Sequence, residues 1–232
     1  MTVLSRAIAS GLTAAATLML LASSAAAHGD VAPQAVDVSG LPKLGDDWLE
    51  ENPWRDPNSE HWKRAVEVGA SGYNQNCARC HGLAAVSGGL APDLRFLEAN
   101  LDGDEWYLER YRNGYTQNGI TKMPAFDELL GQEAAWAIRT YVETRPDEGA
   151  MDDHTRRLKE IRDTLAKATN AEDDAIAPLR KEMMAIAAKV ETGSGAPLAV
   201  SPASLAADFL DGSADGIKKA VNALTVGLSA AK

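Results

Sequence analysis

The chain has 232 residues, of which 45% are hydrophobic, and it carries a formal net charge of −10. This length allows one or two domains and is enough to bury a core. The acidity disfavours binding to nucleic acid or to anionic membrane surfaces, and it favours docking on a basic face of a partner protein. The charge is unevenly distributed, because residues 28–150 carry −10 whereas residues 151–232 carry only −1.

Residues 1–27 have the three regions of a secretory signal peptide. Arg6 supplies a positive charge, residues 7–22 form an apolar run, and Ala25–Ala27 fits the small-residue cleavage rule. The run could instead stay in place as a membrane anchor, but it is shorter than the ~20 residues that a bilayer core requires. We therefore expect export to the periplasm, cleavage before His28, and no membrane span after cleavage.

Apolar residues recur at helical spacing along the rest of the chain and no strand pattern stands out, so we expect an all-α fold. An extended arm rich in proline and glycine comes first, over residues 28–60. A domain over 61–148 and a helical extension over 151–232 follow. Helices are predicted at about 61–77, 104–113, 131–144, 154–169, 172–190 and 217–228, separated by loops at 83–94, 114–126 and 192–202.

Cys77-Ala78-Arg79-Cys80-His81 is a C-x-x-C-H sequence, the pattern of covalent c-type haem attachment. Two thiols three positions apart on a helical turn can each add to one vinyl group of the same porphyrin, and the next residue then directs its imidazole at the iron. Cys77 and Cys80 are thus predicted to hold the haem, with His81 as the proximal iron ligand. The alternatives are a short-loop disulfide or a thioredoxin-like redox pair, and such a pair should follow a buried strand, for which the upstream residues give no pattern.

Met123 is the candidate for the second iron ligand. It is the sole methionine of residues 28–150, and Pro124 follows it. A thioether ligand raises the haem potential for electron transfer. The alternative is a core methionine that fills a gap, but Gly119 and Thr121 indicate a loop around it instead of a buried element.

Two other classes of haem protein are alternatives to an electron carrier. A haem enzyme such as a peroxidase, or a haem-based ligand sensor with the extension as its output, would need a displaceable sixth ligand, and Met123 argues against that. We expect an electron-transfer protein with one haem c per chain and no catalytic acid, base or nucleophile.

Residues from about 66 to 144 resemble a class I cytochrome c. The shared features are Gly69 and Tyr73 before the motif, Gly82 and Pro92 after it, the Met123-Pro124 pair, and Trp136 and Tyr141 in the last helix. The resemblance implies that the first and last helices of the domain cross, with Gly69 and Tyr73 against Trp136 or Tyr141. It also implies that the Pro92 carbonyl accepts a hydrogen bond from Nδ1 of His81, which would fix the orientation and basicity of the ring. Arg95, close by, is a candidate contact for a haem propionate.

Four segments are similar, more narrowly, to the soluble cytochromes c that accept electrons from PQQ-dependent alcohol dehydrogenases: 28–31, 72–76, 88–95 and 103–106. That similarity runs from residue 28 to about 148 and leaves out the extension. It implies a periplasmic quinoprotein dehydrogenase as the electron donor, with a terminal oxidase or another cytochrome as the acceptor. We expect Asp93, Glu98 and Asp104 to lie at the rim of the haem crevice, where their charges would steer the donor.

Overall fold

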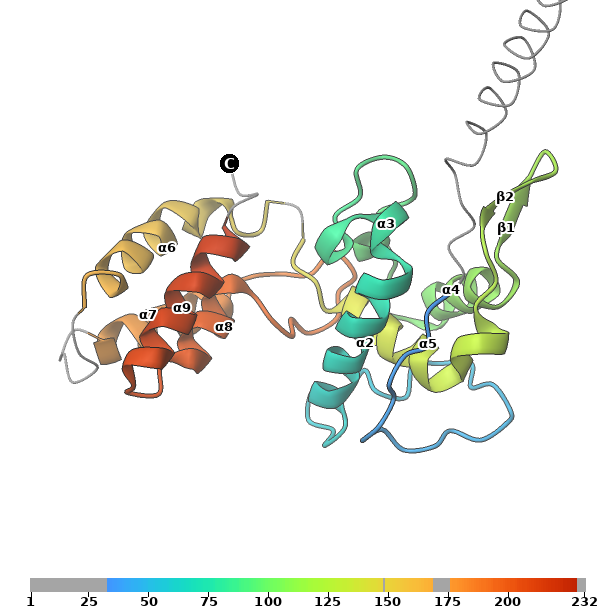
Figure 1. Ribbon diagram of the computed structural model, residues 1–232, viewed down its shortest axis with the longest axis horizontal. Helices are drawn as coiled ribbons and strands as arrows, with labels where there is room; N and C mark the ends of the chain where they lie inside the picture. Colours follow the sequence, from blue (N-terminus) through green and yellow to red (C-terminus); the bar gives the residue numbers. More distant parts are fainter. Residues whose placement is uncertain (1–32, 148, 169–175, 229–232) are drawn as a thin grey trace, which may run out of the picture. The chain divides into compact units, whose positions relative to one another are not determined.

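The computed structural model describes residues 33–147, 149–168 and 176–228, so the expected signal peptide at 1–27 lies outside the described residues. The described part is mostly helical, which confirms the all-α class (Figure 1). No helix within these ranges is long and apolar enough to cross a membrane.

Helices and turns follow one another in three groups. Around the C-x-x-C-H sequence lie α2 (Trp62–Asn76), α3 (Ala78–His81) and the 3-10 turns η1 (Leu83–Ala85) and η2 (Leu94–Phe96). The second group is α4 (Leu101–Asn113), β1 (Tyr115–Gln117), β2 (Ile120–Met123) and α5 (Asp127–Glu143). The extension contains α6 (Asp152–Leu165), α7 (Ile176–Ala187), α8 (Pro202–Phe209) and α9 (Ala214–Gly227).

Residues 115–123 differ from the loop that we expected, because β1 and β2 pair as an antiparallel hairpin. Asn118 and Gly119 form its turn, with positive φ angles of 52° and 75°. An Asn-Gly pair favours such a two-residue turn because both residues tolerate positive φ. The hairpin places Met123 at the end of a strand.

The crossing of α2 and α5 is as the resemblance implied. A Cβ atom at Gly69 would lie 1.9 Å from the carbonyl oxygen of Ala137, so the two helices can touch only because this residue is glycine. One turn further on, the rings of Tyr73 and Tyr141 pack with their centroids 5.3 Å apart. This contact fixes the end of α2, from which the haem motif starts.

The arm packs on the domain through a buried ionic cluster. The Arg55 guanidinium bonds to the carboxylates of Asp104 and Glu143, and Arg139 Nε lies 2.8 Å from Asp104 Oδ1. Asn52 Nδ2 also donates to Glu143, at 2.9 Å. The side chains of Asp104, Arg139 and Glu143 are fully buried. The expectation that Asp104 rims the haem crevice is therefore wrong: two arginines hold it inside the domain.

Helices α6 to α9 share a hydrophobic core of their own. Its fully buried side chains include Leu158, Ile161, Met183 and Leu224. Ser201 begins α8 with a capping box, in which its side chain and that of Ser204 each accept from the other's backbone N–H. The extension is thus a folded bundle with specified helix ends.

Candidate haem site

One helical turn presents the three residues of the motif. Cys77 ends α2 and precedes α3, and its carbonyl oxygen accepts hydrogen bonds from the N–H groups of Cys80 and His81 at 3.1 and 2.9 Å. The side chains of Cys77, Cys80 and His81 therefore all leave the backbone from a single helical turn. No disulfide joins Cys77 and Cys80.

The environment of Cys77 argues against a redox-active thiol pair. Burial, with a smaller contribution from Cys80, raises the pKa of the Cys77 thiol to about 12. A thiol–disulfide oxidoreductase needs the opposite, a cysteine whose lowered pKa gives a reactive thiolate. The motif also follows helix α2 and not a strand.

The ring of His81 is buried and its orientation is fixed by one hydrogen bond. Nδ1 lies 2.9 Å from the carbonyl oxygen of Pro92, which is the contact that the resemblance implied. Among the described residues, Nε2 makes no hydrogen bond. A metal-binding histidine has this arrangement, with one ring nitrogen held by a backbone carbonyl and the other available to the metal.

The loop between His81 and Pro92 is held at both ends. Gly82 has a φ of 84°, and a Cβ atom there would lie 1.8 Å from the Val86 carbonyl oxygen. The Tyr73 hydroxyl donates to the Gly82 carbonyl at 2.8 Å. At the other end, Asp93 accepts from the backbone N–H of Ser87. The Pro92 carbonyl therefore sits in a constrained loop.

Met123 packs against the same hydrophobic cluster as Cys77. The buried members of this cluster include several aromatic and aliphatic side chains: Tyr73, Leu94, Tyr107, Tyr111 and Phe126. The structure thus brings the two candidate regions, 42 residues apart at His81 and Met123, onto one core. Gly114, with a φ of 67°, makes this possible, because a Cβ atom there would lie 2.4 Å from the Met123 carbonyl oxygen.

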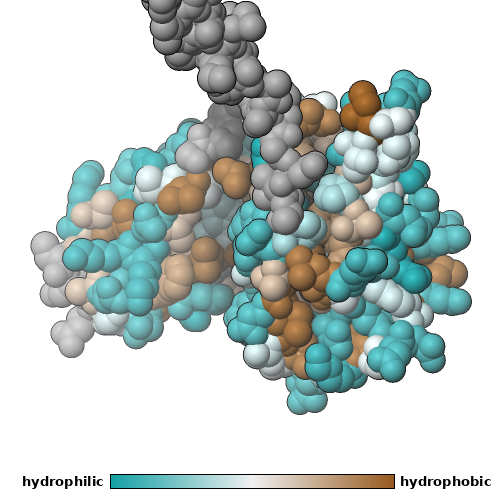
Figure 2. Space-filling view, turned by 45° about the vertical axis from the view of Figure 1, so that its right-hand side comes forward, coloured by the Kyte–Doolittle hydropathy of each residue, from teal (hydrophilic) through white to brown (hydrophobic). Residues whose placement is uncertain are grey.

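These surroundings fit a porphyrin. Tyr107 is buried within the aromatic cluster, which raises the pKa of its hydroxyl well above the ordinary value, and this hydroxyl donates to the Ala135 carbonyl. On the loop after His81, Leu83 and Leu90 are each 77% exposed. Figure 2 shows hydrophobic patches among hydrophilic residues on one face of the molecule. The chain therefore combines attachment thiols, an oriented imidazole, a thioether and apolar contact surface.

Arg95 is buried beside the loop, in an ion pair with Asp93. Its Nη2 lies 2.7 Å from Asp93 Oδ2, and its Nη1 lies 3.4 Å from the Pro146 carbonyl. The pair stabilises the turn that follows Pro92. This role of Asp93 was not among the expectations, although an aspartate two residues before an arginine at a turn is a signal in the sequence.

Comparison with known proteins decides the family. Residues 64–142 match the family model described as cytochrome C oxidase, cbb3-type, subunit III. Cytochrome c550 of Pseudomonas aeruginosa is 56% identical over 124 residues, which are 53% of this chain and 85% of that protein. This chain belongs to the c-type cytochromes. As a c-type cytochrome it carries covalently bound haem c and acts in electron transfer.

Dehydrogenases are also among the relatives of this cytochrome. Quinohemoprotein alcohol dehydrogenase ADH IIB of Pseudomonas putida is 34% identical over 91 residues, 38% of this chain and 12% of that protein. The dehydrogenase subunit of the quinone alcohol dehydrogenase of Gluconobacter oxydans is 32% identical over 81 residues, 35% of this chain and 10% of that protein. The cytochrome thus spans only about a tenth of these two enzymes. No solved structure matches the chain.

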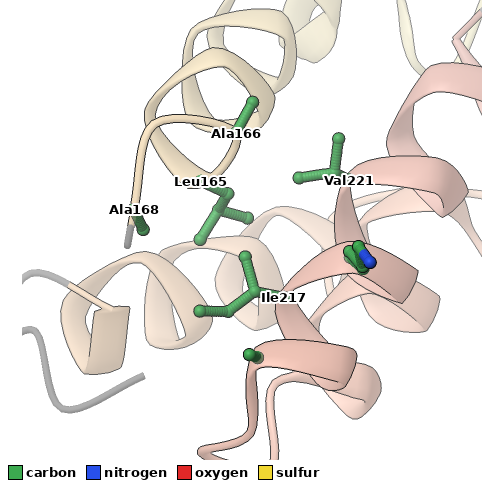
Figure 3. Close-up of a pocket in the computed structure, with 7 residues that line it drawn as sticks. Leu165, Ala166, Ala168, Ile217 and Val221 are labelled. Atoms are coloured by element: carbon green, nitrogen blue, oxygen red, sulfur yellow. The ribbon is translucent and has the colours of Figure 1, made fainter. Parts of the chain in front are cut away.

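A cavity in the bundle is of a different kind. It has a volume of about 370 Å³ and lies between α6 and α9, where Leu165, Ile217 and Val221 point into it (Figure 3). Its lining is aliphatic except for Lys218. The described residues that line it carry no thiol, imidazole or carboxylate.

Proposed function

We propose that this cytochrome carries single electrons in the periplasm, with Cys77 and Cys80 as the haem attachment points and His81 and Met123 as the axial iron ligands. The observation that carries the proposal is the His81–Pro92 hydrogen bond of 2.9 Å, next to both thiols on one helical turn. This hydrogen bond orients the imidazole. Among the described residues, no group of three or more histidine, cysteine, aspartate or glutamate side chains is placed to hold a metal ion.

The residues around the site have three tasks in this proposal. The cysteines fix the position of the haem, and His81 and Met123 set its preference for the ferrous state. The bound haem supplies the one-electron chemistry. The aromatic cluster of Tyr107, Tyr111 and Phe126 excludes water and lowers the local polarity. Arg95, which is already paired with Asp93, is the candidate contact for a haem propionate.

We infer that the donor is a periplasmic quinoprotein alcohol dehydrogenase and that the acceptor is a terminal oxidase or another cytochrome. Two dehydrogenases whose names state this activity contain a segment similar to this chain, which supports a role beside such an enzyme. The signal-like sequence at 1–27 supports export. The acidic charge of residues 28–150 supports docking on a basic partner surface.

Substitution of the attachment residues tests the site. In the Cys77→Ala, Cys80→Ala double variant, we expect haem to be lost on a denaturing gel, because no other cysteine exists in the chain. Arg79→Ala, between the two cysteines, is the matched control and should keep its haem. Haem that migrates with the double variant would falsify the assignment.

A further inference from the structure

Residues 191–200, between α7 and α8, run back from the bundle onto the haem domain, and we name them the return segment (Figure 1). The sequence predicts a free linker here, but the structure pairs its backbone with the domain. The Asp147 N–H donates to the Glu191 carbonyl at 2.9 Å, and Thr192 forms a β-bridge with Pro146. Hydrogen bonds of this kind order a chain that has no helix or strand of its own.

The middle of the return segment joins two parts of the haem domain. The Ala99 N–H, just after η2, donates to the Ser194 carbonyl at 3.0 Å. The Ser194 hydroxyl donates to the Glu143 carbonyl at the end of α5. Ser194 is only 7% exposed. The segment therefore ties η2 to α5.

Gly193 lies in close contact with η2. A Cβ atom at this position would be 2.9 Å from the Arg95 carbonyl oxygen and 2.9 Å from the ring of Phe96. Any larger residue would have to displace η2 or leave its place. The return segment is therefore packed against η2 and does not merely pass over it.

A short path of contacts leads from η2 to the haem ligand. Arg95 of η2 pairs with Asp93, and the residue before Asp93 is Pro92, whose carbonyl lies 2.9 Å from Nδ1 of His81. The loop that ends in Pro92 is thus held by Gly82 on one side and by η2 and the return segment on the other. The extension can act on His81 through this loop.

We propose that the return segment positions the Pro92 carbonyl and thereby tunes the haem potential, so that the extension is a positioning element of the redox site. This inference rests on the assignment of His81 as an iron ligand. A hydrogen bond to Nδ1 makes the imidazole a stronger donor, which stabilises ferric iron. Loosening the return segment weakens that hydrogen bond and should favour the ferrous state.

Two substitutions of different severity test this in the full-length holoprotein. Gly193→Val pushes the segment away from η2, and Ser194→Ala removes only the hydroxyl that bonds to Glu143. In Gly193→Val we expect the ratio of ferrous to ferric haem at a fixed ambient potential to rise about threefold. For a one-electron couple this is an increase of about 28 mV in the reduction potential. Ser194→Ala should change it less, in the same direction.

The control is Ser213→Ala, which removes the cap of α9 but touches nothing in the haem domain. It destabilises the bundle without moving η2, so its potential should equal that of the wild type. A second readout is the exchange of the His81 Nδ1 proton with solvent in the ferrous protein, measured by NMR. We expect this exchange to be faster in both return-segment variants and unchanged in the control.

The outcomes separate this inference from the proposed function. An unchanged potential and an unchanged proton exchange in both return-segment variants would overturn the inference. The ligand assignment is checked separately by the weak absorption band near the red end of the ferric spectrum, which reports methionine bound to the iron. If these variants kept that band, the ligand assignment would stand. Equal shifts in all three variants would also overturn the inference, because bundle stability would then be the cause. If the wild type lacked the methionine band, the ligand assignment itself would fail.

Discussion

Cys77, Cys80 and His81 are predictable as residues because their chemistry depends on local spacing, and a single helical turn preserves that spacing in the fold. Asp104 shows the opposite case. A charged residue near the start of an acidic helix is expected at the surface, yet its partners Arg55 and Arg139 lie 49 and 35 positions away in the sequence. Long-range pairing of this kind leaves no periodic pattern, so the burial of Asp104 could not be anticipated.

Replacement of Met123 tests the second ligand. In Met123→Ala we expect the haem to stay attached through the cysteines, the potential to fall, and carbon monoxide to bind the ferrous iron, since the sixth position loses its thioether. Optical titration and carbon monoxide difference spectra measure these changes. Met184→Ala is the control, because Met184 is a half-exposed residue of α7. An unaltered potential in Met123→Ala would assign the sixth ligand to another residue.

The ionic cluster that holds the arm predicts a pH-dependent effect. Arg55→Ala leaves the buried carboxylates of Asp104 and Glu143 with one arginine, Arg139, instead of two, which should cost about 3 kcal/mol of unfolding free energy at pH 7. Burial raises the pKa of Glu143, against the opposing charges of Arg139 and Arg55, and loss of Arg55 should raise it further.

The sign of the pH dependence follows from that raised pKa. A carboxyl group whose pKa is higher in the folded state destabilises the fold as pH increases from its unfolded value, about 4.3, through its folded value. The deficit of Arg55→Ala should therefore be smaller at pH 4 than at pH 7 in denaturant titrations. Arg64→Ala, which removes an exposed pair with Glu67 and a hydrogen bond to the Ser39 carbonyl, should show a smaller deficit that is alike at both values. A deficit in Arg55→Ala that is the same at both values would contradict this account.

Helical elements are more predictable than strands in this chain, because α2, α4 and α5 bury apolar faces that repeat at helical spacing. The β1–β2 hairpin is short and its side chains are mostly exposed, so no alternation of apolar and polar residues marks it. Its only sequence signal is the Asn118-Gly119 turn. The crossing of α2 and α5 was predictable only through the resemblance to a known family. The close approach of the two helices depends on which residue of α5 faces Gly69, and the sequence alone does not give that pairing.

Gly69→Ala tests that crossing. The added Cβ would lie 1.9 Å from the Ala137 carbonyl oxygen, so α2 and α5 must separate, and we expect a loss of about 3 kcal/mol in unfolding free energy. Gly88→Ala is the matched control, because a Cβ there meets nothing within 4 Å. Thermal unfolding followed by circular dichroism compares the two. Equal stability of both variants would show that the helices can shift apart without cost.

At the scale of the whole molecule, composition predicts an acidic electron carrier but not which carboxylates are available to a partner. Asp104 is buried with two arginines and Asp93 is partly buried beside Arg95, whereas Glu98 is exposed. The extension was predicted as helical, yet its attachment through residues 191–200 was invisible in the sequence. Those residues have the glycine, serine and proline content of a linker, and only the partners across the fold give them a defined conformation.

The charge of residues 28–150 predicts how the rate of reduction depends on salt. If a basic face of the dehydrogenase attracts the cytochrome, this attraction is screened over about 8 Å at physiological ionic strength. The second-order rate constant in stopped-flow reduction should then fall steeply as salt is added.

Glu98→Lys should lower the rate at low salt and weaken its salt dependence. Asp208→Lys, an exposed site on α8, changes the net charge by the same amount, and it should have a smaller effect because it lies in the near-neutral part of the chain. Equal effects of the two substitutions would mean that only net charge matters, and a rate independent of salt would mean that docking is apolar.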